Sequence, residues 1–116
     1  MEILIVRDFI KKGELVKIAA AQFGDVVKAV VDLRQKIMTV GGELHADEEA
    51  KLSEEYNSKR EDLWGINLYP KKDGADWIEF DSMINIKPQY DNSSRYVESE
   101  EIRAKIISAV NKLVRD

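Results

Sequence analysis

Ionisable side chains that could act together on a ligand lie in two stretches of the sequence. The first stretch places the chain's one imidazole, His45, just before the carboxylates of Asp47 and Glu48. The second places Glu79 and Asp81 two residues apart. Carboxylates with one imidazole can bind a divalent cation, and oxygen ligands suit Mg²⁺, Ca²⁺ or Mn²⁺. These residues therefore suggest a metal site of His45, Asp47, Glu79 and Asp81, where metal-bound water would permit hydrolysis.

The same residues also have a purely structural interpretation. The pattern His-x-Asp-Glu-Glu is not the His-Glu-x-x-His zinc motif, and the sequence contains no EF-hand loop. Acidic side chains are common in the first turn of a helix because they interact well with its positive end. Asp47 is accordingly predicted to be the N-cap of a short helix that runs through Tyr56. In this interpretation His45 ends a strand and Glu48 lies in a solvated first turn.

A third group of polar residues, from Asn92 to Arg95, comes just before the last predicted helix. Amide, hydroxyl and guanidinium groups near a helix N-terminus could hold a carboxylate or a phosphate. Alternatively, Asn and Ser side chains satisfy the backbone of their own loop, and Arg95 pairs with Asp91 or with the acidic segment. A serine triad is not supported, because His45 is the one imidazole and no Gly-x-Ser-x-Gly motif is present.

Residues 63–87 predict the β-hairpin that would position most of these side chains. Apolar residues alternate along both arms, and a turn from Pro70 to Gly74 separates them. The apolar positions are Trp64, Ile66 and Leu68 on the first arm and Ile78, Phe80, Ile84 and Ile86 on the second. Pairing Leu68 with Ile78 keeps these residues on one face.

The opposite face of this hairpin is then polar. It carries Asn67, Tyr69, Glu79, Asp81, Asn85 and Lys87, with Trp77 beside Tyr69 and with Gly65 opposite Asp81. A glycine at that position leaves space above the sheet for a ligand or a covering loop. The polar face is either a recognition surface or the solvated side of an antiparallel sheet that is covered on one face only.

The remaining patterns predict the elements that complete the fold. The apolar run from Ile3 to Val6 predicts a central strand, and helical spacing predicts helices over residues 14–23 and 100–114, the latter with Ser99 as N-cap. Residues 26–44 fit either a helix or a second hairpin of strands 26–33 and 37–44. The valines favour the hairpin, with Gly41 and Gly42 as a bulge or a close-approach point inside the return strand.

These elements predict one α+β domain spanning residues 1–116. The expected order is β-α-β-β-(short α)-β-β-α, with a mostly antiparallel sheet of about five strands and two main helices packed on one face. A chain of 116 residues with 44% hydrophobic and 34% charged residues can bury a core without disulfides or metal.

Charge and composition limit the partners and the location. Residues 43–62 hold eight acidic and three basic side chains, so this segment has a net charge of −5. The whole chain has a net charge of −4, so the remaining residues together carry +1. This acidity argues against nucleic-acid binding and favours cations or basic partners. The absence of cysteine, of a leader-like N-terminus and of a membrane-spanning run predicts a soluble cytoplasmic protein, and a homodimer remains open.

Four segments of the chain resemble a family of small uncharacterised bacterial and archaeal proteins. They are GGELHADEEAKL (41–52), LWGINLYP (63–70), IEFDSMINIKP (78–88) and NSSRYVESEEIR (92–103). The resemblance covers nearly the whole chain and implies no activity, cofactor or partner. The sequence therefore favours a small binding or interaction module that recognises a protein or a small molecule through the polar hairpin face. The alternative is a cation-dependent hydrolase or related enzyme that uses His45 and the clustered carboxylates.

Overall fold

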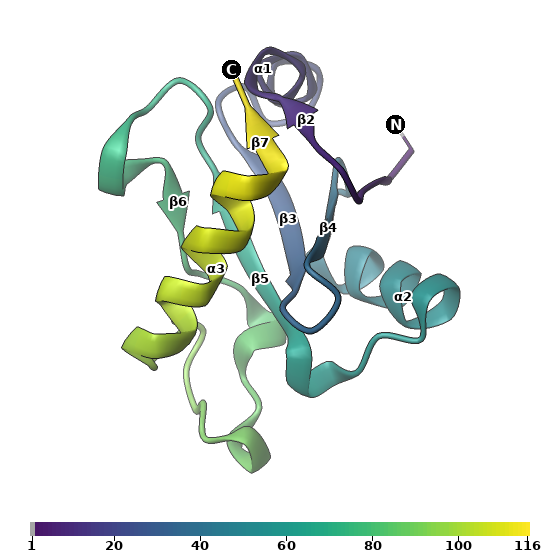
Figure 1. Cartoon of the computed structure of the whole chain (residues 1–116), viewed down its shortest axis with the longest axis vertical. Helices are drawn as coiled ribbons and strands as arrows, with labels where there is room; N and C mark the ends of the chain where they lie inside the picture. The colour runs from purple at the N-terminus through teal and green to yellow at the C-terminus, as the bar shows by residue number, and fades with distance from the viewer. Residues whose placement is uncertain (1) are drawn as a thin grey trace.

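The computed structural model describes residues 2–116 as an α+β fold, in agreement with the predicted class. Five antiparallel strands form one sheet in the order β1-β4-β3-β5-β6 (Figure 1). Their bounds are β1 (Leu4–Val6), β3 (Val27–Asp32), β4 (Ile37–Val40), β5 (Leu63–Leu68) and β6 (Ile78–Glu79). The helices are α1 (Lys12–Ala21), α2 (His45–Tyr56) and α3 (Glu100–Leu113). A small second sheet pairs β2 (Ile10–Lys11) in parallel with β7 (Val114–Arg115).

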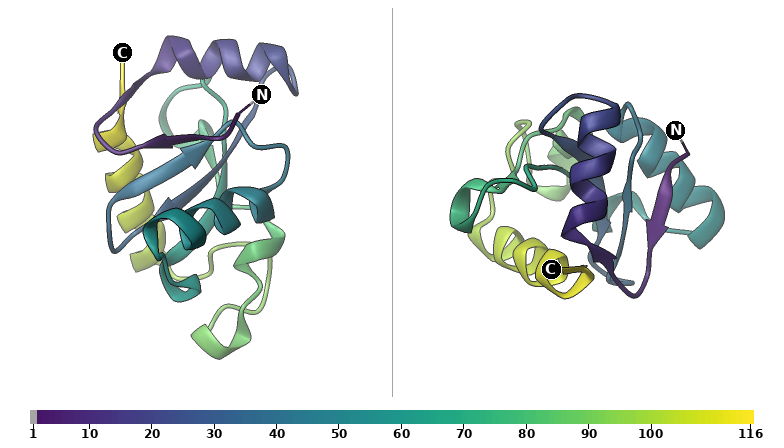
Figure 2. Two further views of the ribbon diagram at one scale, coloured as in Figure 1. Left: turned by 90° about the vertical axis from the view of Figure 1, so that its right-hand side faces the viewer. Right: turned by 90° about the horizontal axis from the view of Figure 1, so that it is seen from above.

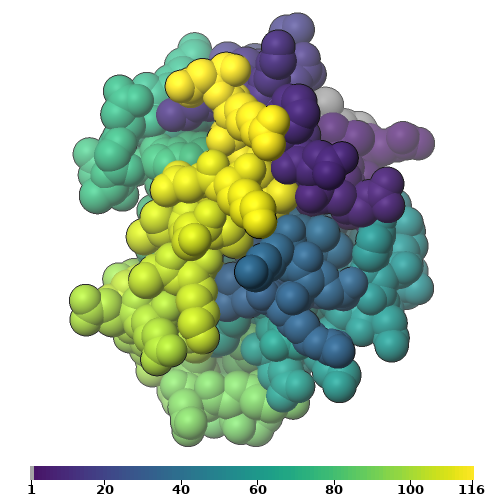
Figure 3. All heavy atoms as spheres, viewed as in Figure 1, coloured from purple at the N-terminus to yellow at the C-terminus, as the bar shows by residue number. Residues whose placement is uncertain are grey.

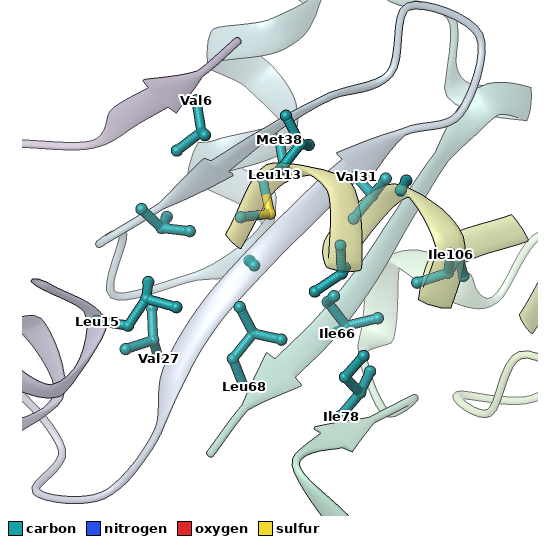
Figure 4. Close-up of a cluster of buried hydrophobic side chains, with 14 of the residues drawn as sticks. Val6, Leu15, Val27, Val31, Met38, Ile66, Leu68, Ile78, Ile106 and Leu113 are labelled. Carbon is teal, nitrogen blue, oxygen red and sulfur yellow. The ribbon is translucent and has the colours of Figure 1, made fainter. Parts of the chain in front are cut away.

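The two main helices, α1 and α3, pack against one face of the sheet, as predicted. Alternate residues of a strand point to opposite faces, so β5 directs Trp64, Ile66 and Leu68 toward these helices. Ile66 and Leu68 lie in the larger hydrophobic core with Leu15 of α1 and Ile106 of α3 (Figure 4), and Trp64 belongs to the same core. We call this side of the sheet the α3 face.

Helix α2 covers part of the opposite side of the sheet, which we call the α2 face (Figure 2). A smaller core lies here, formed by Val30, Ile37, Leu52, Leu63 and Ile84. Strands β3 and β5 are therefore buried on both faces. Among residues 2–116, no helix has both the length and the apolar character needed to cross a membrane.

The first strand is not central, contrary to the prediction. β1 pairs with β4 alone and forms an edge of the sheet, where Leu4 is 44% exposed. The middle of the sheet is β3, which pairs with both β4 and β5. A short apolar run is compatible with either position, because local sequence does not specify how many neighbours a strand has.

The hairpin after α1 is confirmed, and the helical alternative for residues 26–44 is wrong. β4 ends at Val40, so Gly41 and Gly42 lie after the strand and not inside it. Gly42 is nevertheless a close-approach point, since a Cβ there would lie 2.6 Å from Cγ of Glu48. Helix α2 begins at His45 with Leu44 as its N-cap, so Asp47 is not the N-cap that the sequence suggested.

The hairpin of residues 63–87 has the predicted register only at its start. Leu68 pairs with Ile78 and Asn67 with Glu79, after which the second arm leaves the ladder. A 3₁₀ turn at Met83–Asn85 carries Ile84 to the α2 face instead of the α3 face. Trp77 packs in the larger core and not on the polar face, because it follows a 3₁₀ turn where strand alternation does not apply.

The last helix agrees closely with the prediction. α3 begins at Glu100, and the Ser99 side chain accepts a hydrogen bond of 3.2 Å from the backbone N–H of Ile102. The loop before it, which follows β6 and contains Asn92 and Arg95, folds back on itself through two isolated bridges, Lys87 with Asn92 and Asp81 with Tyr96. The bridge between Asp81 and Tyr96 brings Arg95 next to the hairpin.

Candidate functional site

A pocket of about 220 Å³ opens on the α2 face, where α2 begins. It lies between the start of α2, strands β3 and β5, and the segment that follows β6. Its polar lining residues are Lys28, His45, Asn67, Asp81, Ser82 and Arg95. Four of these were predicted from the sequence as site residues, and they come from separate segments of the chain: His45, Asn67, Asp81 and Arg95.

His45, the first residue of α2, is anchored to the sheet. Its Nε2 lies 2.8 Å from the carbonyl oxygen of Ile66. A carbonyl oxygen can only accept, so Nε2 carries the hydrogen of this bond. Burial lowers the pKa of His45 below its ordinary value of 6.5. The ring is therefore neutral at neutral pH, and its Nδ1 holds a lone pair that can accept a hydrogen bond.

Asn67 connects the pocket to the carboxylates of the hairpin. Its Nδ2 donates to Oε1 of Glu79 at 2.8 Å and to the carbonyl oxygen of Asp81 at 3.0 Å. The hydroxyl of Tyr69 also donates to Oε1 of Glu79, at 3.4 Å, and burial together with this carboxylate raises the pKa of Tyr69. Glu79 itself does not line the pocket, so these contacts orient the Asn67 side chain and leave its Oδ1 as an acceptor.

Arg95 and Asp81 form an ion pair at the edge of the pocket. Nε of Arg95 lies 2.7 Å from Oδ1 of Asp81, and Nη2 lies 3.4 Å from Oδ2. The hydrogen bond with Asp81 raises the pKa of Arg95. The partner of Arg95 is thus Asp81, and not Asp91 or the acidic segment as expected. Both side chains are about half exposed, so the guanidinium is oriented but still accessible to a ligand.

Two sources of positive potential at this pocket were not predicted from the sequence. Lys28 lies in β3 directly opposite Asn67, and within residues 2–116 it forms no ion pair. The N-terminus of α2 has no side-chain cap, since Leu44 occupies that position. In the same range, no hydrogen-bond acceptor contacts the backbone amides of His45 and Ala46. The one feature of the sequence that could have indicated Lys28 is its position as the single charged residue among the valines of residues 26–31.

Asn85 and Asn92, also predicted as binding residues, hold the backbone around the site. Oδ1 of Asn85 accepts from the Gly65 N–H at 2.8 Å, and its Nδ2 donates to the carbonyl oxygens of Gly65 and Arg95. Nδ2 of Asn92 donates to the carbonyl oxygens of Asn85, Ser94 and Tyr96. Both side chains are buried, so they fix the loop that carries Arg95 and do not face a ligand.

The space above Gly65 is also explained by this loop. A Cβ at Gly65 would lie 2.5 Å from Cβ and Oγ of Ser82, so the covering segment fills the position that the sequence left open for a ligand or a loop. Ser82 accepts a hydrogen bond from the backbone N–H of Ile84 at 3.3 Å, which holds the segment in place.

The predicted metal ligands are not brought together. In the part of the chain that the structure describes, no group of three or more His, Asp or Glu side chains is arranged to hold a metal ion. Asp47 is exposed on α2. Glu79 accepts a hydrogen bond from Asn67, and Asp81 accepts one from Arg95. The cation-dependent hydrolase is therefore not favoured by this geometry.

Glu48, a further predicted binding residue, is fully buried behind Gly42. Its Oε2 accepts a hydrogen bond of 3.0 Å from the backbone N–H of Gly42, and burial raises the pKa of this carboxyl well above its ordinary value. The hydrogen bond of Glu48 thus connects the start of α2 to the loop that precedes it, and Glu48 does not line the pocket.

The fold and the pocket define a small α+β protein with a two-faced sheet and a polar site at the start of its middle helix. Residues 4–113 match the family described as "Protein of unknown function (DUF5674)", and the chain belongs to this family. No curated protein and no solved structure matches the chain. The predicted membership in a family of unknown function is confirmed at this level.

Proposed function

We propose that this protein is a non-enzymatic binding module and that the pocket at the start of α2 binds a small ligand with a carboxylate or phosphate group. The observation that carries the proposal is that one pocket holds both the uncapped N-terminus of α2 and Lys28. Among residues 2–116 the Lys28 ammonium has no carboxylate partner, and it lies 5.2 Å from the centre of the Phe23 ring. Each of these features attracts an anion. Together they supply an ammonium group and two free backbone N–H donors.

The local charge supports an anionic ligand although the whole chain carries −4. Lys28 and Arg95 are the cations of the lining, Asp81 is its one carboxylate, and His45 is neutral. Hydrogen bonds to a charged group contribute about 1.5 to 3 kcal/mol each, roughly twice the value for neutral pairs. An oxyanion could accept from Lys28, from the α2 amides and from the outer N–H groups of Arg95.

The size and rim of the pocket limit the rest of the ligand. A volume of about 220 Å³ lies below the roughly 300 to 1,000 Å³ of pockets that hold drug-sized molecules. Leu44 and Met83 flank the opening and are 56% and 63% exposed. The ligand that fits is therefore a small organic acid or phosphate ester with a short apolar portion.

Thermal unfolding in the presence of acetate, succinate or inorganic phosphate tests this proposal. Binding to the folded state alone raises the unfolding free energy by about 1.4 kcal/mol when the ligand is present at roughly ten times its Kd. We expect at least one of these anions to raise the Tm in a saturable way. The anion that does so distinguishes a carboxylate site from a phosphate site.

Two variants locate the effect. Lys28→Met should abolish the anion-dependent rise in Tm, whereas Lys17→Met, which removes an exposed ammonium on α1, should retain it. An equal rise in the Lys28→Met protein, or no saturable rise in the parent protein with any of the three anions, would contradict the proposal.

A cytoplasmic location and a homodimer are retained as proposals. The first is supported by the absence of cysteine from the sequence, which suits a reducing compartment. Whether the protein is a homodimer can be decided by measuring the mass of the purified protein in sedimentation.

A further inference from the structure

A second hollow lies on the α3 face, remote from the pocket at the start of α2. It is a groove of about 640 Å³ between α3 and the turn that joins β3 to β4, with residues 61–62 at one side. Figure 3 shows this side of the molecule, with α3 in yellow next to the blue β3–β4 segment.

The walls of the groove carry an excess of positive charge. Arg34 and Lys36 come from the turn, and Lys105 and Lys112 come from α3. Within residues 2–116, Lys105 pairs with Glu101 at 3.5 Å, whereas the other three cations form no ion pair. The acidic wall residues are Glu61 and Asp62. The groove is thus locally basic in a chain of net charge −4.

The cations project from well-fixed elements. Oδ1 of the buried Asp32 accepts from the backbone N–H groups of Arg34 and Gln35 at 2.9 and 3.0 Å, which holds the turn. Lys105 and Lys112 are seven residues apart on α3 and so lie on the same side of the helix. A hydrogen-bonded turn thus forms one wall of the groove, and a helix forms the other.

The floor between these cations is apolar. It is formed by Leu33, Trp64, Ile102 and Ala109. Ile102 and Leu33 are partly exposed at the edge of the larger core, so an apolar group bound here would extend that core. A ligand that matches the groove therefore combines apolar side chains with flanking negative charges.

We propose that this groove binds an acidic peptide segment of a partner protein, with an apolar side chain on the floor and carboxylates toward Arg34, Lys36, Lys105 and Lys112. Charge complementarity supports this occupant. A nucleic acid fits less well, because Glu61 and Asp62 would repel its phosphates. A second copy of the chain is the competing occupant: no large apolar side chain is exposed within its acidic helix α2, and the exposed Leu44 before that helix lines the other pocket.

A synthetic peptide tests the proposal directly. The probe is the acetylated and amidated heptapeptide Glu-Asp-Leu-Phe-Glu-Asp-Glu, and its control has Lys in place of every acidic residue. In a ¹⁵N–¹H NMR titration of the whole protein, we expect saturable shifts of the amides of Arg34, Ser108 and Ala109 with the acidic probe alone. Raising the NaCl concentration from about 0.05 to about 0.5 M should weaken binding, because salt screens exposed charges.

Charge-reversed variants localise the contact. Lys105→Glu combined with Lys112→Glu should weaken the probe's affinity at least about tenfold, whereas Lys17→Glu on α1, which is also exposed but lies outside the groove, should leave it unchanged. Circular dichroism verifies that both variants are folded. The proposal is overturned if the acidic probe does not bind, if the lysine peptide binds equally well, or if the double variant keeps the parent affinity. It is also overturned if the parent protein self-associates in sedimentation at low salt and the double variant does not, since a second copy would then occupy the groove.

Discussion

The two faces of the sheet are packed in different ways. Among the described residues 2–116, nineteen buried hydrophobic residues form one core on the α3 face, whereas the core on the α2 face has five. The cause is visible in β5, which directs Trp64 and Ile66 to one side and Gly65 and Asn67 to the other. The comparison suggests that the α3 face supplies most of the stability. The α2 face, with fewer apolar contacts to satisfy, can hold buried amides and a polar pocket.

The largest expected difference between the faces is in stability. Ile66→Ala removes a fully buried side chain from the larger core and should lower the free energy of unfolding by about 2 to 5 kcal/mol. Met83→Ala, at the rim of the pocket, should change it by less than about 0.5 kcal/mol because that side chain is 63% exposed. Urea unfolding of both variants measures these values. Similar losses at the two positions would refute the contrast.

The second prediction concerns a buried cation. Lys87 was predicted on the polar face of the hairpin but is fully buried, with Nζ 2.7 Å from the carbonyl oxygen of Arg60 and 3.7 Å from the centre of the Trp64 ring. Burial lowers the pKa of Lys87 from 10.5 to about 8. The folded state therefore binds fewer protons than the unfolded state between these two pH values, and stability should rise with pH across this window.

Replacing Lys87 by Met should remove that dependence. The parent protein is expected to gain about 1 to 3 kcal/mol relative to Lys87→Met as the pH rises from 8 toward 10.5, because one pKa unit corresponds to about 1.4 kcal/mol. Urea unfolding at several pH values provides the measurement, and the difference between the two proteins cancels other titrations. A difference that stays constant or changes sign would show that the ammonium is stabilised where it lies.

A small effect is also expected for Asp81→Asn. The ion pair with Arg95 is about half exposed, and such pairs contribute roughly 0 to 1 kcal/mol. We expect a loss of stability below about 1 kcal/mol and no shift of the Tm by millimolar Mg²⁺, Ca²⁺ or Mn²⁺ in either protein. A cation-dependent shift in the parent protein that Asp81→Asn abolishes would restore the metal hypothesis and displace the anion pocket.

The sequence predicted the parts of this fold that depend on local pattern. The alternation of Trp64, Ile66 and Leu68 located β5, and the hydrophobic match of Leu68 with Ile78 gave the register of the two residue pairs nearest the turn. Pattern failed where tertiary neighbours decide, as for the edge position of β1. It also failed at Trp77, because a 3₁₀ turn interrupts the period of two.

The pocket was predicted in part for the same reason. His45, Asn67, Asp81 and Arg95 were recognised by side-chain chemistry, since each is a polar group at a strand end, on a strand or in a loop. Lys28 was missed because its role depends on its position across from Asn67 in another strand. The uncapped helix end was missed because the helix begins two residues before the predicted N-cap.

The most direct test of the central claim is the NMR response of the α2 N-terminus to an anion. When acetate or inorganic phosphate is added to the ¹⁵N-labelled protein, the amide signals of His45 and Ala46 should shift in a saturable way together with that of Lys28. Residues of the larger core that are remote from the pocket, such as Leu15 and Ile106, should be unaffected. The ionic strength is kept constant with NaCl during the titration. The assignment of the α2 face as the binding face would be contradicted if the His45 and Ala46 signals did not move at high anion concentration, or if shifts were spread evenly over both faces of the sheet.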